Sequence, residues 1–175
     1  MSFGEAIKAC FQKYATFSGR ARRSEYWYFY LFYFLVSLGL SFLSILTPFA
    51  RYLSLFLGLA FFIPNLAVCV RRFHDIGKSG WNYLIILIPE LLLNCYLLYL
   101  ISYVIKESKL NNGVVKNFLD GGSPSLNFLF ALGAINLAVT ILWLIWMTED
   151  SQPGENKWGP NPKEVPSESN SGMNY

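Results

Sequence analysis

The residues best suited to chemistry in this sequence are an adjoining histidine and aspartate, His74 and Asp75. A histidine beside a carboxylate can carry protons or bind a metal ion. A closed metal site needs three or four ligands, and the three cysteines are scattered without a C-x-x-C pair. We therefore expect no metal and no cofactor. Neighbouring helical residues point apart, so we expect Asp75 to pair with Arg71 or Arg72, and His74 to bond a loop carbonyl.

The composition excludes several classes of protein. Hydrophobic residues make up 54% of the 175 residues and aromatic residues 18%, whereas charged residues make up only 14%, against about 25% in a soluble domain. A disordered chain would be poor in aromatic residues, and a soluble globule would need more charge to cover its surface. The net charge of +3 is too small to indicate nucleic-acid binding. The composition indicates a single-domain membrane protein.

Four long apolar segments supply the elements that must position these residues. They cover residues 27–46, 52–70, 83–104 and 127–147. A hydrocarbon core about 30 Å thick needs roughly 20 helical residues, and backbone groups within lipid must pair internally. The sequence therefore predicts an all-α membrane protein in which four transmembrane helices form a four-helix bundle.

The lysines and arginines predict the orientation of the spans. The N-terminal segment, the loop 71–82 and the tail together hold ten of them, whereas Arg51 and the loop 105–126 together hold four. Cytoplasmic segments carry the excess of positive charge. We therefore expect both termini and the loop 71–82 to be cytoplasmic, and the loop 105–126 to face outward.

The segments at the two ends of the chain lie outside the lipid. In residues 1–26, apolar side chains recur at helical spacing from Phe3 to Tyr14, which predicts a short amphipathic helix before an arginine-rich motif. That helix lies at the cytoplasmic interface or packs on the inner face of the bundle, and both interpretations stay open. Residues 148–175 form a polar cytoplasmic tail, for which we expect disorder after about residue 163.

Three motifs are more elaborate than a plain membrane hairpin requires. They read S-G-R-A-R-R-S-E-Y-W at 18–27, R-R-F-H-D-I-G-K-S-G-W at 71–81, and G-E-N-K-W-G-P-N-P at 154–162. Together they resemble the YhaH/YhaI-like family of bacterial inner-membrane proteins (domain of unknown function 805), from about Phe11 to Pro162. The resemblance implies a bacterial inner-membrane protein with several spans and implies no established reaction.

The predicted orientation places all three motifs on the cytoplasmic face, where they could form one surface. Arginine planes match phosphate groups, and basic clusters attract anionic lipid, so a site for an anionic ligand or lipid headgroup is one hypothesis. In the alternatives, the arginines only set the orientation, or they pair with the acidic tail. The candidate residues are Arg20, Arg22, Arg23, Arg71, Arg72, His74, Asp75, Lys78 and Trp158.

A second set of polar residues lies inside the spans: Asn65, Glu90, Asn94 and Asn136. Such groups are costly against lipid and should face the interior of the bundle. They could line a polar path or form hydrogen bonds between helices, with Asn65 paired to Glu90 and Asn94 to Asn136.

These observations favour a non-enzymatic inner-membrane protein whose cytoplasmic motif cluster binds anionic lipid headgroups or a protein partner. A small transporter that uses the intramembrane polar residues is the first alternative. An enzyme acting on a phosphorylated lipid, with His74 and Asp75 beside the arginines, is the second. We expect membrane lipids as partners, leave a homo-oligomer or another membrane protein open, and expect no nucleic acid.

Overall fold

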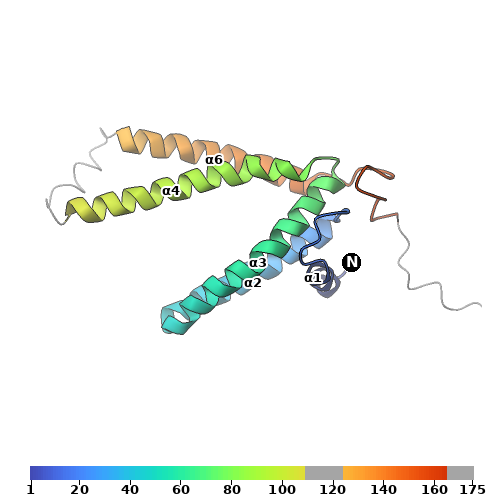
Figure 1. Cartoon of the computed structure of the whole chain (residues 1–175), viewed down its shortest axis with the longest axis horizontal. Helices are drawn as coiled ribbons and strands as arrows, with labels where there is room; N and C mark the ends of the chain where they lie inside the picture. Colours follow the sequence, from blue (N-terminus) through green and yellow to red (C-terminus); the bar gives the residue numbers. More distant parts are fainter. Residues whose placement is uncertain (109–123, 165–175) are drawn as a thin grey trace, which may run out of the picture. The chain divides into compact units, whose positions relative to one another are not determined.

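The computed structural model describes residues 1–108 and 124–164. These residues divide into two compact units, which we describe separately. Unit 1 contains residues 1–81 and 146–164, and unit 2 contains residues 82–108 and 124–145. The helices, shown in Figure 1, are α1 (Phe3–Gln12), α2 (Arg23–Leu46), α3 (Pro48–Asp75), the 3-10 turn η1 (Gly80–Asn82), α4 (Tyr83–Ser108) and α6 (Pro124–Thr148).

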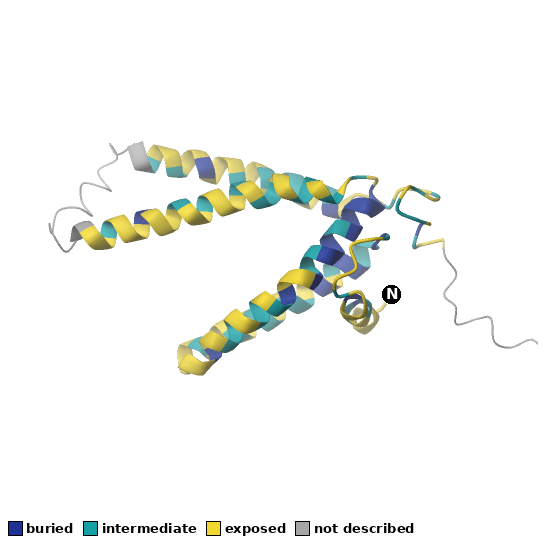
Figure 2. Cartoon of the chain, in the orientation of Figure 1, coloured by how far each residue is buried: buried dark blue, intermediate teal, exposed yellow. Residues whose placement is uncertain are grey.

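The all-α prediction is confirmed, since α2, α3, α4 and α6 are each long and apolar enough to cross a membrane. Most of their large apolar side chains are exposed, among them Leu38, Phe42, Leu59 and Leu98. Such surfaces suit lipid, which solvates apolar side chains as well as a protein interior does. Buried residues gather instead near the start of α2 and the end of α3 (Figure 2).

Helices α2 and α3 form an antiparallel hairpin in unit 1 (Figure 1). The hairpin turns at Thr47, whose extended backbone ends α2, and Pro48 begins α3 at the first helical position, where its missing N–H costs no hydrogen bond. Phe61 of α3 packs against Phe29 and Phe32 of α2, with ring centroids 6.2 and 5.8 Å apart. This aromatic contact holds the two spans together near their buried end.

The amphipathic helix α1 packs across this hairpin. A capping box starts α1, because the Ser2 side chain accepts from the Glu5 N–H and the Glu5 side chain accepts from the Ser2 N–H. Ala6 and Cys10 are fully buried, and Phe11 contacts Phe29, with ring centroids 5.7 Å apart. Helix α1 therefore packs on the hairpin while its outer face stays exposed, which is compatible with both interpretations of this helix.

The C-terminal end of α3 reaches further than the predicted span. The predicted boundary was residue 70, but the helix continues to Asp75. It ends in a Schellman motif, in which the Lys78 N–H donates to the Phe73 carbonyl and the Gly77 N–H to the His74 carbonyl. Gly77 has φ +76°, which a residue without Cβ adopts at low cost. Half of the second motif is therefore helical.

Unit 2 contains α4 and most of α6. The Asn136 side chain of α6 donates to the Pro89 carbonyl of α4 at 3.2 Å, and Tyr96 meets Phe128 edge to face, with ring centroids 4.8 Å apart. Residues 109–123 of the predicted outward loop, and the part of the tail from residue 165 onward, lie outside the described residues.

The end of α3 yields a stability prediction. We expect Gly77→Ala to lower the free energy of unfolding by about 1–2 kcal/mol, because an L side chain at positive φ is strained. Its Cβ would also lie 2.8 Å from the Gln152 side-chain oxygen. Denaturant titration in mixed micelles measures the change. The control is Gly4→Ala in α1, where nothing lies within 4 Å of an added Cβ. Equal stability of both variants would contradict the prediction.

Candidate functional site: an arginine cluster closed by the C-terminal segment

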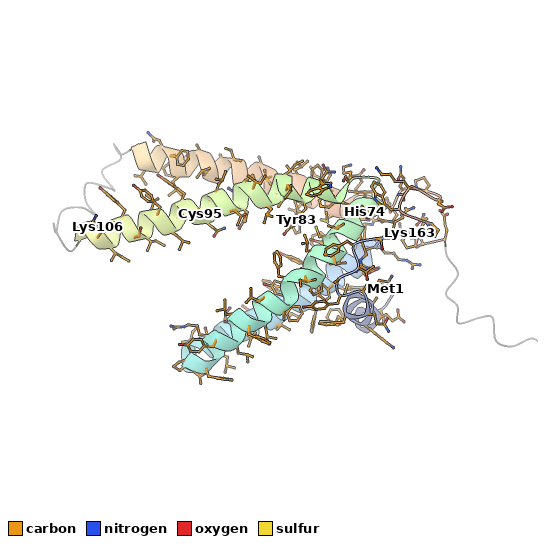
Figure 3. All side chains as sticks on the ribbon, viewed as in Figure 1. Met1, His74, Tyr83, Cys95, Lys106 and Lys163 are labelled. Atoms are coloured by element: carbon orange, nitrogen blue, oxygen red, sulfur yellow. The ribbon has the colours of Figure 1, made fainter. Side chains whose placement is uncertain are left out.

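The three sequence motifs meet at one end of unit 1. The Ala21 N–H of the first motif donates to the Arg71 carbonyl of the second at 3.1 Å. The Gln152 N–H, just before the third motif, donates to the Asp75 carbonyl at 2.9 Å. We call the five arginines gathered here the arginine cluster; its members are Arg20, Arg22, Arg23, Arg71 and Arg72. Figure 3 labels His74 at the same end.

Asp75 is the centre of the arginine cluster. Its Oδ1 lies 3.0 Å from Arg20 Nε, and its Oδ2 lies 2.5 Å from Arg72 Nη1. The Ser151 hydroxyl donates to the same Oδ2 at 2.6 Å. All three charged side chains are at most 1% exposed. The predicted pairing of Asp75 with a neighbouring arginine is confirmed for Arg72, and Arg20 is a second partner.

A second buried ion pair lies beside the first. Arg71 Nη1 is 2.8 Å from Glu25 Oε1, and both side chains are nearly fully buried. Cys10 of α1 donates its S–H to the same oxygen at 3.9 Å, while burial raises the pKa of its thiol to about 12. Cys10 therefore acts as a small neutral donor. Within the described part of the chain, Arg71 Nη1 and Nη2 and Arg72 Nε make no hydrogen bond of good geometry.

The arginines also bind the end of α6. Arg72 Nη2 donates to the carbonyls of Met147 and Glu149, and Arg23 Nη1 donates to the Thr148 carbonyl at 3.0 Å. The last carbonyls of a helix have no partner within the helix and carry partial negative charge. The cationic side chains therefore cap α6, and this fixes the point at which the C-terminal segment starts.

The C-terminal segment then passes around Arg20. The Arg20 Nη1 donates to the Gly154 carbonyl at 2.7 Å and the Gly159 carbonyl at 3.3 Å, and its Nη2 donates to the Gln152 carbonyl at 2.5 Å. Arg22 donates to the Pro162 carbonyl. We call residues 154–164 the strap. Strap carbonyls therefore bind the Arg20 and Arg22 donors that the sequence hypothesis assigned to an anionic ligand.

An aromatic stack fixes the middle of the strap. The Trp158 indole lies parallel to the His74 ring, with centroids 4.5 Å apart and an interplanar angle of 10°, and Lys157 Nζ lies 4.2 Å from the indole centroid. His74 Nδ1 contacts the Gly19 carbonyl at 3.2 Å, which agrees with the predicted bond to a loop carbonyl. The Asn156 amide donates to the His74 carbonyl at 2.9 Å.

The rim of the arginine cluster carries weaker, exposed ion pairs. Asp150 Oδ1 lies 2.7 Å from Arg23 Nη2 and 2.6 Å from Lys163 Nζ, and the hydrogen bond from Lys163 lowers the pKa of Asp150. Lys78 Nζ lies 3.4 Å from Glu149. Water and salt screen such pairs, so each contributes little stability.

All nine predicted site residues therefore lie at the same end of unit 1. They contact one another directly or share a contact with one intervening residue. The sequence assigned no role to four residues that complete the arrangement: Glu25, Ser151, Gln152 and Asn156. Glu25 could have been found, because it is the one acid inside the first arginine-rich motif. The carbonyls of the strap gave no sequence signal, since every residue has one. One of the open alternatives was that the arginines pair with the tail. The described contacts include such pairing, since Arg20, Arg22 and Arg23 all bind groups of the C-terminal segment.

The intramembrane polar residues do not join the arginine cluster. Asn65 donates to the Phe61 carbonyl of its own helix at 2.9 Å. Asn94 donates to the Glu90 carboxylate at 3.2 Å, one turn away on α4. The predicted bond between Asn94 and Asn136 is absent among the described residues, because Asn136 donates to the carbonyls of Pro89 and Leu132 instead. Backbone carbonyls therefore satisfy the Asn136 amide, one on its own helix and one on α4, in place of the Asn94 side chain.

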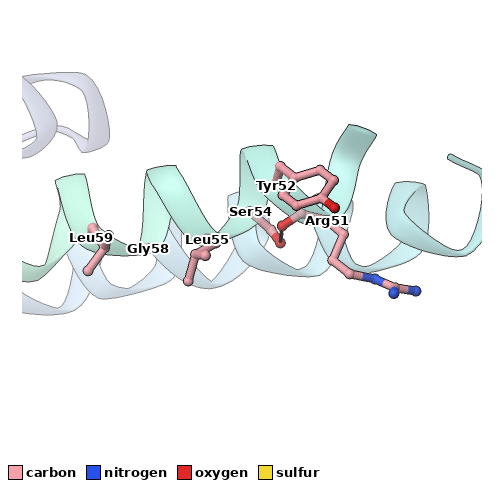
Figure 4. Close-up of a pocket in the computed structure, with 6 residues that line it drawn as sticks. All are labelled: Arg51, Tyr52, Ser54, Leu55, Gly58 and Leu59. Atoms are coloured by element: carbon pink, nitrogen blue, oxygen red, sulfur yellow. Dashed lines mark hydrogen bonds between the residues drawn. The ribbon is translucent and has the colours of Figure 1, made fainter. Parts of the chain in front are cut away.

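A shallow groove of about 530 Å³ lies near the other end of α3 and is separate from the arginine cluster. Figure 4 shows its lining residues, with the Arg51 guanidinium directed away from the ribbon. Arg51 precedes Arg71 by 20 residues, or about 30 Å along a helix. The residues are Arg51, Tyr52, Ser54, Leu55, Gly58 and Leu59. The groove is mostly apolar, and α3 is one of the four helices long and apolar enough to cross a membrane.

Comparison with known proteins decides the family. Residues 14–160 match the family described as "Protein of unknown function (DUF805)". The chain belongs to this family. It is 39% identical over 79 residues to the inner membrane protein YhaI of Escherichia coli K12, covering 45% of this chain and 67% of that protein. It is 37% identical over 83 residues to the inner membrane protein YhaH of the same strain, covering 45% and 69%. No solved structure matches. The protein is thus a helical inner-membrane protein with several spans.

The buried charges yield a second prediction. Asp75→Asn leaves two buried guanidiniums without a counter-charge, so we expect a loss of about 3–5 kcal/mol in the free energy of unfolding. Asp150 offers a matched control, because it also serves two cations but is 66% exposed; Asp150→Asn should change stability little. Denaturant titration in mixed micelles compares the free energies of unfolding of the two variants. If both variants unfold at the same denaturant concentration, Asp75 does not hold the cluster together.

Proposed function

We propose that the protein is a non-enzymatic inner-membrane protein that binds anionic lipid headgroups on its cytoplasmic face. The observation that carries the proposal is the excess of cations at the end of unit 1 described above. Ten lysines and arginines there meet seven described carboxylates, and two of these carboxylates, Asp75 and Asp150, each serve two cations. Internal pairing consequently leaves positive charge unmatched.

The unmatched charges lie where a headgroup could reach them. Lys8 of α1, Lys13 at its C-cap and Lys157 of the strap are exposed. No carboxylate lies at ion-pair distance from them among the residues the structure describes. Phe3 and Phe11 of α1 are about 40% exposed. A helix with exposed aromatic and basic side chains suits the boundary between headgroups and acyl chains. This pairing favours lipid over a soluble anion.

The positions of His74 and Asp75 support a non-enzymatic role. Asp75 is fully buried between two arginines, and His74 lies against Trp158 and the Gly19 carbonyl. A general base must reach the proton of a substrate, and both residues are at most 9% exposed. The transport alternative gains no support from Asn65 and Asn94, whose described hydrogen bonds stay within their own helices. It gains none from Asn136 either, whose bond to the Pro89 carbonyl links α6 to α4.

The proposal requires the arginine cluster to be cytoplasmic, as the distribution of positive charge predicts. We expect a reporter inserted at Gly121 to report the outer side and one fused to the C-terminus to report the cytoplasm. The side of each fusion is measured with two reporters, one active only in the cytoplasm and one active only outside it. If both fusions report the same side, one span is assigned wrongly and the cytoplasmic proposal fails.

Lipid binding is tested by removing the unmatched charges without touching the buried ion pairs. The double variant Lys8→Gln, Lys13→Gln should bind phosphatidylglycerol several-fold more weakly than the unaltered chain, because each basic residue near the surface contributes about 1 kcal/mol. Mass spectrometry of lipids retained after purification from mixed phosphatidylglycerol and phosphatidylcholine measures the change.

Arg51→Gln combined with Lys106→Gln is the matched control, since it removes two charges predicted to lie on the outer side. We expect it to retain phosphatidylglycerol like the unaltered chain. Unchanged phosphatidylglycerol in the Lys8, Lys13 variant would refute the proposal. An equal loss in both variants would show a response to net charge and would refute a localised site.

A further inference from the structure

The strap presents the arginine cluster with neutral groups where an anion would bind more strongly. Arg20 Nη1 binds the carbonyls of Gly154 and Gly159, and Arg22 binds the carbonyl of Pro162. Guanidinium groups match phosphate bidentately, and hydrogen bonds in which both partners are charged are shorter and stronger than bonds to a neutral carbonyl. A phosphate oxygen therefore competes well for these donors.

The contacts around Arg20 divide into an inner and an outer layer. In the inner layer, Asp75 binds Arg20 and Arg72 and receives the Ser151 hydroxyl, all with the charged side chains buried. The outer layer contains the strap. Its ion pair from Lys163 to Asp150 is exposed at both ends, at 44% and 66%. Breaking the inner layer would leave buried charges without a partner. Water can replace the exposed contacts of the outer layer at a much smaller cost in free energy.

The charge of the strap agrees with its role as a placeholder. Its lysines, Lys157 and Lys163, balance its glutamates, Glu155 and Glu164, so a docked strap brings no net charge to a positive surface. A headgroup phosphate would bring the missing negative charge. Gly154, where the strap begins, has φ +65°, a conformation that glycine adopts freely. The chain can therefore change direction at Gly154 while Ser151 and Gln152 stay bound.

We propose that the strap is an internal ligand of the arginine cluster, and that the phosphate of an anionic lipid displaces it from Arg20 and Arg22. This inference rests on the proposed lipid binding and names its regulation. With the strap docked, only the exposed lysines Lys8, Lys13 and Lys157 contact headgroups. With the strap released, Arg20 Nη1 and Arg22 join them, while the Asp75 ion pairs remain. The face thus responds to the anionic lipid content of its own membrane.

Hydrogen exchange on the full chain tests the displacement. The protein is placed in nanodiscs of phosphatidylcholine or of phosphatidylglycerol, and amide exchange is followed by mass spectrometry. We expect peptides from residues 154–164 to exchange several-fold faster in phosphatidylglycerol. The Gln152 amide, which donates to the Asp75 carbonyl, should exchange equally in both lipids. Strap exchange that is unchanged or slower in phosphatidylglycerol would overturn the inference.

A full-length variant tests the competition from the other side. Trp158→Ala removes the stack on His74 and loosens the strap, so it should retain several-fold more phosphatidylglycerol than the unaltered chain. Trp81→Ala is the control, because Trp81 is 78% exposed and lies outside the strap; it should leave retention unchanged. Equal or lower retention in the Trp158 variant would refute competition between strap and lipid.

The two proposals fail in different ways. If the Lys8, Lys13 variant retains normal phosphatidylglycerol, the lipid proposal itself is wrong. If that variant loses phosphatidylglycerol but strap exchange and the Trp158 variant do not respond, lipid binds the exposed lysines alone and the strap is a permanent structural part.

Discussion

The arrangement of unit 1 depends on one carboxylate that is shared by two buried guanidiniums. Asp75 holds Arg20 from the first motif and Arg72 from its own helix, and Ser151 joins from the C-terminal segment. Desolvating three charges is costly, and a buried ion pair is favourable only when its remaining groups are also hydrogen bonded. The carbonyls at the end of α6 and along the strap meet that requirement for Arg20 and for the Nη groups of Arg72, whose Nε makes no hydrogen bond among the described residues. The need to satisfy these arginines draws three distant segments together.

This constraint separates the arginines into two roles. Arg20, Arg71 and Arg72 are buried beside carboxylates and hold segments in place. Arg22 and Arg23 lie further out and bind groups that a solvent ion or lipid could replace. A basic motif beside a membrane is therefore not automatically a lipid site. In this family member, exposed lysines on α1 offer the free charge, and the arginines form the support on which α1 and the strap rest.

The sequence predicted the spans well, because about 20 consecutive apolar residues have few stable forms other than a transmembrane helix. It also predicted that Asp75 pairs with a neighbouring arginine, since helical spacing brings residues three apart onto one face. It placed the end of α3 too early, because charged residues at 71–75 look like a loop although they continue the helix. It missed the bond from Asn136 to the Pro89 carbonyl, because hydropathy says nothing about which backbone groups come within reach.

The sequence alone determined that this is an all-α membrane protein and which three motifs are special, since both follow from local composition and spacing. What the arginines bind became clear only from the folded chain. Asp75 could have met one arginine or several, and the tail could have stayed free. Which donors meet which carbonyls depends on where α6 ends and where the chain turns at Gly154 and Gly159. These are long-range geometric facts, fixed by which partners the folded chain brings within reach of the buried charges.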